Sequence, residues 1–370
     1  MGIILGFTGA IESITPNMAA AAELAWAEIN EAGTWLGGQT IVPVRGNSGC
    51  TDTPLATATA ERLVSSEGIV ALMGPDCSGV TIAVLQNVAM PNGLPMISPA
   101  ATSPALTTIE DDGLFFRTAP SDARQGQLIA EILLERGITD VAVTYTNNDY
   151  GLGLSNAFSG AFTSGGGTIT ATVAHEDGRG DYSAEVGTLA SAGGQALAVF
   201  GYADLGGVGM IQASVETGAF ETFILADGMF AQSLIDTIGP DLDGSFGVVP
   251  WTEGEGTETF AEVARAAGID PDTAYTRESY DAAALLALAA VAGGEASSEA
   301  IAANILRVAN APGEPILPGE LARAIEILAD GGEIDYVGAS NVELIGPGEA
   351  AGSYREYNIE SGSFVTVSFR

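Results

Sequence analysis

The sequence contains no lysine, a single histidine (His175) and only two cysteines among its 370 residues. Without lysine there is no Walker-type phosphate loop, no Schiff-base lysine and no Ser–Lys dyad. A single histidine disfavours a multi-histidine zinc site and a Ser–His–Asp triad, and no G-x-S-x-G nucleophile elbow is present. We therefore expect no enzyme activity, no metal site and no cofactor.

Positive charge is scarce as well. The twelve basic residues, all arginine, face 47 aspartates and glutamates, so the formal net charge is −35. A field this negative argues against nucleic acid and anionic membrane surfaces as partners. The acids are scattered along the chain and do not form a tail, which is typical of an acidic protein adapted to salt.

No apolar run approaches the roughly 18 residues that a membrane-spanning helix needs. Met1 and Gly2 lead directly into the apolar run Ile3–Phe7 without a basic stretch. Two interpretations stay open: a cytosolic protein, or a mature exported protein whose export signal was replaced by a start codon.

The two cysteines, Cys50 and Cys77, follow the apolar runs Ile41–Val44 and Val70–Met73. If these runs are neighbouring strands of one sheet, their turns lie side by side and a disulfide is possible. A disulfide would indicate an oxidising compartment. Two unpaired, buried cysteines are the alternative.

Apolar runs alternate with helical patterns through two successive units, as expected for two domains in a chain of this length. The predicted strands of the first unit are Ile3–Phe7, Ile41–Val44, Val70–Met73, Met96–Ile97 and Leu114–Arg117. Those of the second are Asp140–Tyr145, Thr168–His175, Ala196–Phe200, Thr222–Ala226 and Ser245–Val249. Strands separated by helices predict an α/β fold with two doubly wound, parallel sheets.

The remainder of the chain returns to both units. Residues 257–330 are Ala-rich and helical with no predicted strand, and short strands follow at Val342–Ile345, Tyr354–Ile359 and Phe364–Phe369. We expect lobe 1 to comprise 1–119 and 251–330, and lobe 2 to comprise 120–250 and 331–370. The chain is expected to cross between the two lobes three times, near 118–121, 249–252 and 330–341, and these crossings would form a hinge.

Polar loops follow two neighbouring predicted strands, at Asp76–Gly79 and at Ser98–Ser103. Ligands of open α/β sheets bind at the carboxyl ends of strands, and a helix N-terminus there favours an anionic group. No nucleophile stands beside a base in these loops. The pattern predicts a binding site.

Several motifs, in order along positions 1 to about 290, resemble one family: the leucine/isoleucine/valine-binding type I periplasmic proteins, receptors of branched-chain amino-acid ABC importers. The matching segments are Gly6–Gly9, the Cys50 loop, Gly74–Ser78, Met96–Pro104, Phe116–Asp122, Asp149–Gly151 and Tyr280–Ala282. The resemblance implies two α/β lobes that are joined by three strands and close on a ligand in the cleft.

The resemblance also implies a set of ligand contacts. The Ser78 and Thr102 hydroxyls, with backbone N–H groups near Ala101, would hold the ligand's carboxylate. The Ala100 carbonyl and Asp227, where the family usually has Glu, would hold its ammonium.

The rest of the pocket follows from the same resemblance and from the first loop. Tyr150 and Tyr202 of the second lobe would close over the ligand. Ile14 occupies a position where relatives often carry an aromatic residue, and Glu12 and Ser13 should border the cleft. Trp251 is a candidate for the side-chain pocket.

Together these features predict an exported, periplasmic solute-binding protein of an ABC importer. It would bind an amino acid or close analogue as a monomer and deliver it to the permease subunits. Alternatives are a cytosolic ligand-sensing regulator of the same fold, or an importer receptor for urea, a short amide or an aromatic carboxylate. Arg277 would reach the cleft mouth or pair with Glu278 or Glu253.

Overall fold

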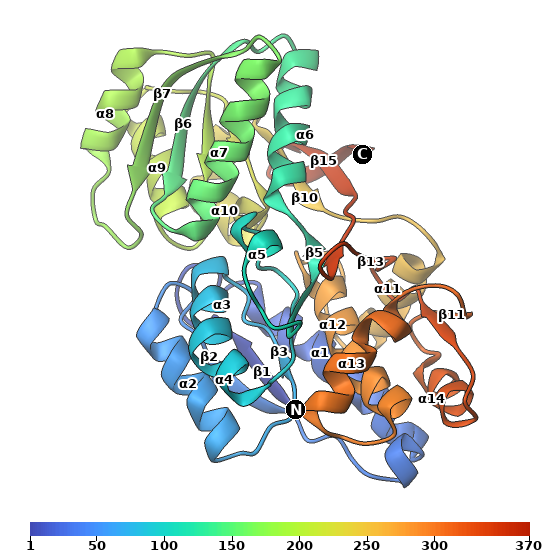
Figure 1. Ribbon diagram of the computed structural model, residues 1–370. Helices are drawn as coiled ribbons and strands as arrows, with labels where there is room; N and C mark the ends of the chain where they lie inside the picture. Colours follow the sequence, from blue (N-terminus) through green and yellow to red (C-terminus); the bar gives the residue numbers. More distant parts are fainter.

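Two seven-stranded sheets organise the computed structural model, which describes residues 1–370 (Figure 1). The first sheet comprises β1 (Gly2–Leu5), β2 (Val44–Asn47), β3 (Leu72–Met73), β4 (Met96–Ser98), β5 (Phe115–Pro120), β13 (Leu344–Ile345) and β14 (Glu349–Ala350). The second comprises β6 (Asp140–Thr146), β7 (Thr168–His175), β8 (Ala196–Phe200), β9 (Phe223–Leu225), β10 (Phe246–Pro250), β15 (Tyr354–Glu360) and β16 (Ser363–Phe369). Each sheet is the centre of one lobe.

Five parallel strands in each sheet follow the same plan. Their orders are β5-β4-β3-β1-β2 in lobe 1 and β10-β9-β8-β6-β7 in lobe 2. The direction of connection therefore reverses between β1 and β3, and again between β6 and β8. This is the doubly wound arrangement that the alternating pattern predicts, and β1 and β8 are buried along their whole length, as strands covered on both faces should be.

Helices cover both faces of each sheet. Lobe 1 carries α1 (Thr15–Ala32), η1 (Trp35–Gly37), α2 (Thr53–Ser65), α3 (Ser78–Val84), η2 (Leu85–Ala89), α4 (Met90–Asn92), α5 (Ala105–Thr108), α11 (Glu255–Ala266), α12 (Thr276–Gly293), α13 (Ser298–Ala309) and α14 (Leu321–Ala329). Lobe 2 carries α6 (Asp122–Glu135), α7 (Asp149–Ser164), α8 (Ser183–Ala192), α9 (Gly206–Thr217), η3 (Asp227–Met229), α10 (Gln232–Ile238) and η4 (Gly239–Leu242). A small sheet of β11 (Glu314–Ile316) and β12 (Ile334–Tyr336) extends lobe 1.

The Ala-rich helix α12 is buried from Thr276 to Val291. Its small side chains let α1 and α13 pack closely against it. The indole N–H groups of Trp26 and Trp35 donate to the carbonyls of Ala283 and Ala287 over 2.8 and 3.0 Å. These bonds fix α12 against the N-terminal part of the chain.

The chain crosses between lobes three times: between β5 and α6, between β10 and α11, and between β14 and β15. The third crossing was expected at 330–341. Because β12 pairs with β11, and β14 pairs with β5, residues 334–350 belong to lobe 1. The crossing lies instead between Ala350 and Tyr354.

Two strand predictions also need correction. The strand expected at Ile41–Val44 forms at Val44–Asn47, after Pro43, whose missing N–H disfavours a central strand. A short strand, β11, lies within the region expected to be wholly helical.

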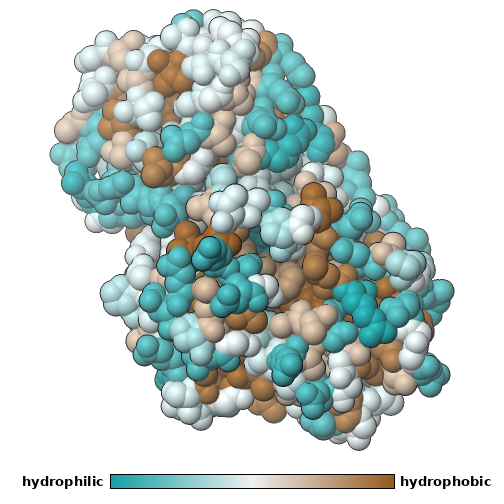
Figure 2. Space-filling view, in the orientation of Figure 1, coloured by the Kyte–Doolittle hydropathy of each residue, from teal (hydrophilic) through white to brown (hydrophobic).

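No single helix has the length and apolar composition of a membrane span; only α12 and α13 together, bent by 108°, meet both criteria. In the space-filling view, hydrophilic and near-neutral residues cover most of the visible face, and hydrophobic residues gather where the lobes meet, just below, and in smaller areas on the upper lobe (Figure 2).

Candidate functional site

The connection reversals of the two sheets face each other across the cleft. In open α/β sheets, ligands bind at the carboxyl ends of strands where the strand order reverses. A cavity of about 20 Å³ lies there. Lobe 1 lines it with Ile11, Ile14, Asp76, Cys77, Ser78, Ala100 and Tyr275, and lobe 2 with Tyr150, Tyr202, Asp227 and Gly228. We call this space the head-group cavity.

Ser78 is the first residue of α3, at the carboxyl end of β3, and is almost fully buried. Its hydroxyl accepts a hydrogen bond from the Ser103 N–H over 3.1 Å. Thr102, equally buried, has a hydroxyl with no hydrogen-bond partner, although it is not a wall of the head-group cavity. Two hydroxyls and a helix N-terminus are suited to hold a carboxylate.

Ala100 and Ala101 differ in position. Ala100 lines the head-group cavity, whereas Ala101 does not. The Ser98 hydroxyl accepts from both of their N–H groups, at 3.3 and 2.9 Å, and the Ala101 carbonyl accepts from Arg117 over 3.0 Å. The backbone of Ala101 is therefore already committed within lobe 1.

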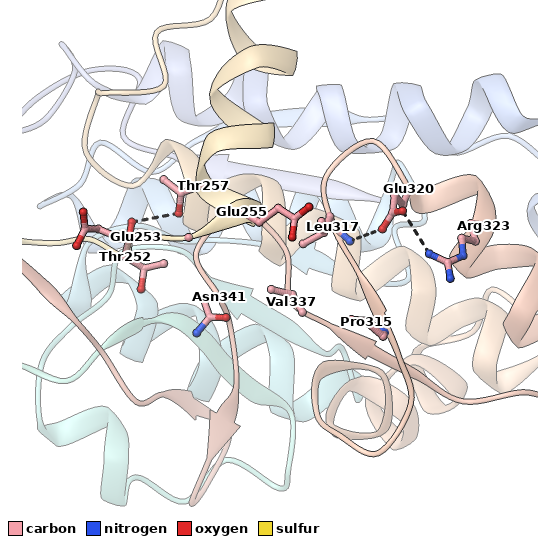
Figure 3. A pocket seen from close by; sticks show the side chains of 12 residues that line it. Thr252, Glu253, Glu255, Thr257, Pro315, Leu317, Glu320, Arg323, Val337 and Asn341 are labelled. Carbon is pink, nitrogen blue, oxygen red and sulfur yellow. Dashed lines mark hydrogen bonds and ion pairs between the residues drawn. The ribbon is translucent and has the colours of Figure 1, made fainter.

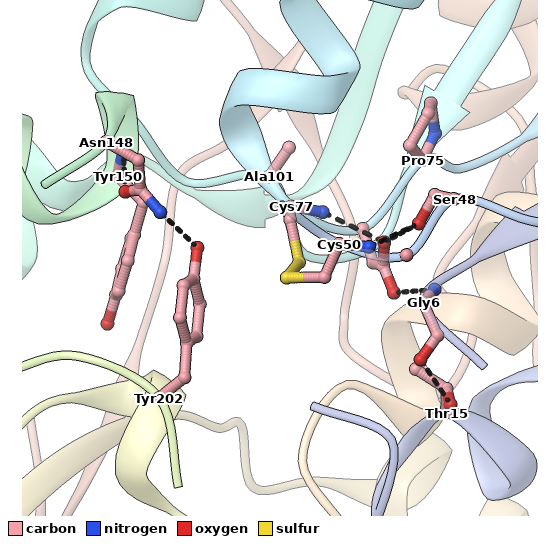
Figure 4. Close-up of a disulfide and its surroundings, with 12 residues drawn as sticks. Gly6, Thr15, Ser48, Cys50, Pro75, Cys77, Ala101, Asn148, Tyr150 and Tyr202 are labelled. Carbon is pink, nitrogen blue, oxygen red and sulfur yellow. Dashed lines mark hydrogen bonds between the residues drawn. A yellow bond between two sulfur atoms is a disulfide. The ribbon is translucent and has the colours of Figure 1, made fainter. Parts of the chain in front are cut away.

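Asp227 follows β9 and is 3 % exposed. The Tyr150 hydroxyl donates to one carboxylate oxygen over 2.8 Å, and the Tyr275 hydroxyl donates to the other. Burial raises the pKa of Asp227, while these hydrogen bonds oppose the shift. Tyr202 stacks on Tyr150 with ring centroids 5.1 Å apart, and its hydroxyl accepts from Asn148 (Figure 4).

A second acid, Asp122, lies beside this group and was missed as a site residue. Asp122 is the first residue of α6, and Ser121 before it caps the helix by accepting a hydrogen bond from the Ala123 N–H. Both carboxylate oxygens of Asp122 are buried without a hydrogen-bond partner. Burial, followed by the charge of Asp227, raises the pKa of Asp122 well above its ordinary value.

Tyr275 was also missed. It precedes α12 with a φ of 60°, a left-handed conformation that is uncommon for a bulky residue and turns the chain into the helix. Its position in an Ala-rich segment gave no signal of a site, because its partner, Asp227, lies 48 residues away in the sequence.

The predicted disulfide is confirmed: Cys50 and Cys77 are bonded, with Cα atoms 5.2 Å apart (Figure 4). Their strands β2 and β3 are not neighbours, since β1 lies between them, so the bridge passes over the end of β1. Beneath it, Asp76 accepts from the N–H groups of Gly6 and Cys77, at 2.6 and 3.0 Å. Burial raises the pKa of Asp76 to about 6.

The first loop contributes unequally. Glu12 is exposed and its carboxylate accepts a hydrogen bond from the Gly9 N–H over 3.0 Å, so it stabilises the turn that contains it. The Ser13 N–H donates across the cleft to Asp204 over 2.9 Å. Only Ile14 of these three predicted residues lines the head-group cavity.

Trp251 does not line the head-group cavity. It borders a larger cavity of about 630 Å³, which shares Ile14 as a wall. The Arg277 guanidinium lies 3.4 Å from the Trp251 ring centroid and contacts Asp272 at 3.4 Å. Arg277 pairs with neither Glu278 nor Glu253.

Another cavity, of about 400 Å³, lies outside the cleft, between the start of α11 and the β11 region (Figure 3). Two of its charged side chains are engaged, since Arg323 pairs with Glu320 and Glu314, and Glu320 accepts a hydrogen bond from the Leu317 N–H. The other two, Glu253 and Glu255, have no ion-pair partner. No group of three or more His, Cys, Asp or Glu side chains is arranged to hold a metal ion.

Known proteins resemble this chain along most of its length. A family model described as "Periplasmic binding protein" matches residues 1–319. A Brucella melitensis protein named "Leu/Ile/Val-binding protein homolog 1" is 28% identical over 348 residues, 90% of this chain and 91% of that protein. The Halobacterium salinarum "Chemotactic signal transduction system substrate-binding protein BasB" is 27% identical over 301 residues, 79% and 70% of the two chains.

Solved structures agree on the fold. The leucine-binding protein LivK of Thermotoga maritima superposes with a TM-score of 0.83 at 24% identity, covering 100% of this chain and 97% of that one. The two lobes, their shared strand order and the family match over 319 residues lead to one conclusion: the chain belongs to the periplasmic binding protein family.

Proposed function

We propose that this chain is the solute-binding protein of an ABC importer, which closes its lobes around an amino acid or a close analogue. The observation that carries the proposal is the opposite chemistry of two walls of one site. The lobe 1 wall carries the Ser78 hydroxyl at the N-terminus of α3, and the lobe 2 wall carries the buried carboxyl group of Asp227. Thr102 and Asp122 do not line the cavity; they lie side by side, and the Asp122 N–H donates to the Thr102 carbonyl over 2.8 Å.

A zwitterion fits this division. Its two charges lose hydration when enclosed, so donors must replace water at the carboxylate and acceptors at the ammonium. Ser78 and Thr102 donate at one end without a buried arginine. Asp227, with Asp122 beside it, accepts at the other, and the Ala100 carbonyl adds a neutral acceptor.

Lobe closure belongs to the same proposal. The head-group cavity of about 20 Å³ has room for little more than one water molecule. Tyr275 of lobe 1 and Asp227 of lobe 2 are in direct contact, so an amino acid enters only when the lobes separate. A ligand that bridges both lobes then shifts the hinge toward the closed state.

Partners and location follow from this role. The ligand would be carried to the permease subunits of the importer by a monomer working in the periplasm, the compartment in which a Cys50–Cys77 disulfide persists. Binding and release require no chemical step, and the site holds no nucleophile paired with a base.

A second candidate is a receptor that reports its ligand to a sensory transducer. The relative named for chemotactic signal transduction favours it, over 79% of this chain. Affinity purification from membranes separates the two roles, because an importer receptor retains permease subunits and a sensory receptor retains the transducer.

Titration calorimetry with the L-amino acids, urea and acetamide tests the ligand class. We expect at least one amino acid to bind with a dissociation constant of about a micromolar, or −8 kcal/mol. Binding of urea or acetamide alone would replace the amino acid by a short amide. Absence of binding across the panel would refute the proposal.

A further inference from the structure

The larger cavity between the lobes has walls from both of them. Ser13, Ile14 and Asn17 line it from lobe 1, and Phe230 and Arg355 from lobe 2. Its volume of about 630 Å³ is typical of small-molecule sites. It is separate from the head-group cavity, with which it shares only the side of Ile14.

Arg355 is the exception among the arginines. Eleven of the twelve have a carboxylate oxygen within 4.0 Å, in a chain that carries 47 acids; Arg355 has none. Its Nε has no hydrogen-bond partner, and one Nη donates to the Phe364 carbonyl over 3.2 Å. Since a guanidinium has five N–H donors, this side chain retains donors for a carboxylate.

Aromatic rings surround the Arg355 guanidinium. Its central carbon lies 5.0 Å from the Trp251 ring centroid and 5.4 Å from that of Phe230. Phe364 packs on Phe230 with centroids 4.2 Å apart. A cation between apolar ring faces suits a ligand with one anionic group on an apolar body.

The other charges at the cavity limit that ligand. Asp270 and Asp272 also line it. Asp272 is shared by Arg265 and Arg277, at 3.6 and 3.4 Å, whereas Asp270 has no arginine partner. The unpaired negative charge of Asp270 opposes a second anionic group on the ligand.

We propose that this cavity is a second ligand site, which takes a small monocarboxylate with an apolar or aromatic body. The carboxylate pairs with Arg355, and the body lies against Trp251, Phe230 and Phe364. This site is distinct from the one that binds the amino-acid head group.

Calorimetry with benzoate, and with benzamide as its neutral isostere, tests the site at constant ionic strength. We expect the unmodified protein to bind benzoate at least tenfold more tightly than benzamide, because only benzoate pairs with a guanidinium. Arg355→Gln should weaken benzoate binding at least tenfold. Ser78→Ala should leave it unchanged.

A second pair of variants avoids the buried part of Arg355. Thr366 is an exposed wall residue. Thr366→Glu should weaken benzoate binding by repulsion between the two carboxylates. Thr366→Gln, whose side chain has the same shape as glutamate but no charge, should not. If benzoate does not bind, or if its binding responds to Ser78→Ala and not to Arg355→Gln, the second site is refuted. Amino-acid binding, measured separately, decides the proposed function independently of either result.

Discussion

The Tyr275 hydroxyl of lobe 1 donates a hydrogen bond to the Asp227 carboxylate of lobe 2, across the cleft. Tyr150 occupies the other oxygen of the same carboxylate. A ligand ammonium that binds Asp227 therefore shares the carboxylate with bonds that the protein makes with itself, since each oxygen accepts at most two hydrogen bonds. The Tyr275 bond holds the lobes together and competes with the ligand at one atom.

Replacing Tyr275 by Phe removes this competitor. We expect the affinity for the amino acid to rise by about 1 kcal/mol, the typical net value of one hydrogen bond, as measured by calorimetry. Tyr336→Phe is a matched control, because the buried Tyr336 hydroxyl also donates to a carboxylate, that of Asp281, away from the cleft. Weaker binding by Tyr275→Phe would show that the hydroxyl contacts the ligand instead.

The hydroxyls of Ser78 and Thr102 are predicted to bind the ligand's carboxylate. Ser78→Ala and Thr102→Ala should each weaken binding by roughly 1 to 3 kcal/mol, since the desolvated carboxylate loses a donor. Ser191→Ala, at an exposed position of α8 far from the cleft, serves as the control. Unchanged affinity in both cleft variants would move the carboxylate site elsewhere.

Binding should depend on pH through Asp122 and Asp227. The pKa values of both carboxyl groups are raised, first by burial. An ammonium binds best to the ionised forms, so the affinity should fall as the pH is lowered through these raised pKa values. Calorimetry at a series of pH values measures the slope.

Asp122→Asn provides the control for the pH dependence. This variant removes one of the two titrating groups, so its affinity should change less steeply with pH. An identical pH dependence in the variant would exclude Asp122 from the linkage.

The Cys50–Cys77 bridge should support both stability and binding. It spans 27 residues, for which loop-closure entropy predicts a loss of roughly 3.5 kcal/mol of unfolding free energy in a double Cys→Ala variant. Calorimetric melting measures this loss. Because Cys77 precedes Ser78, the amino-acid affinity should also fall; a variant with unchanged melting would refute the stabilising role.

The sequence predicted most of the fold because its strands are strongly apolar and separated by clear helices. The third crossing was misplaced for a physical reason: β13 and β14 have two residues each, and they join lobe 1 because β14 makes a long-range pairing with β5 while β13 pairs with β14. No local pattern reports such pairing.

In the candidate site too, residues marked by a local sequence pattern could be predicted, and residues placed there only by tertiary contacts could not. Ser78 and Asp227 stand at strand ends, which hydrophobic patterns and the family resemblance reveal. Asp122 sits at a helix start, where an acid has an ordinary local role, and Tyr275 precedes a helix far along the chain. Only tertiary structure brings these two residues to Asp227.

The positions at which the chain crosses between the lobes have a consequence for altering specificity. All lobe 2 walls of the head-group cavity lie in one uninterrupted segment, from Tyr150 to Gly228, whereas lobe 1 supplies its walls from two distant segments, residues 11–100 and Tyr275. The lobe 2 half can therefore be exchanged as a single cassette between the first and second crossings. Recognition is modular on one side of the cleft and dispersed on the other.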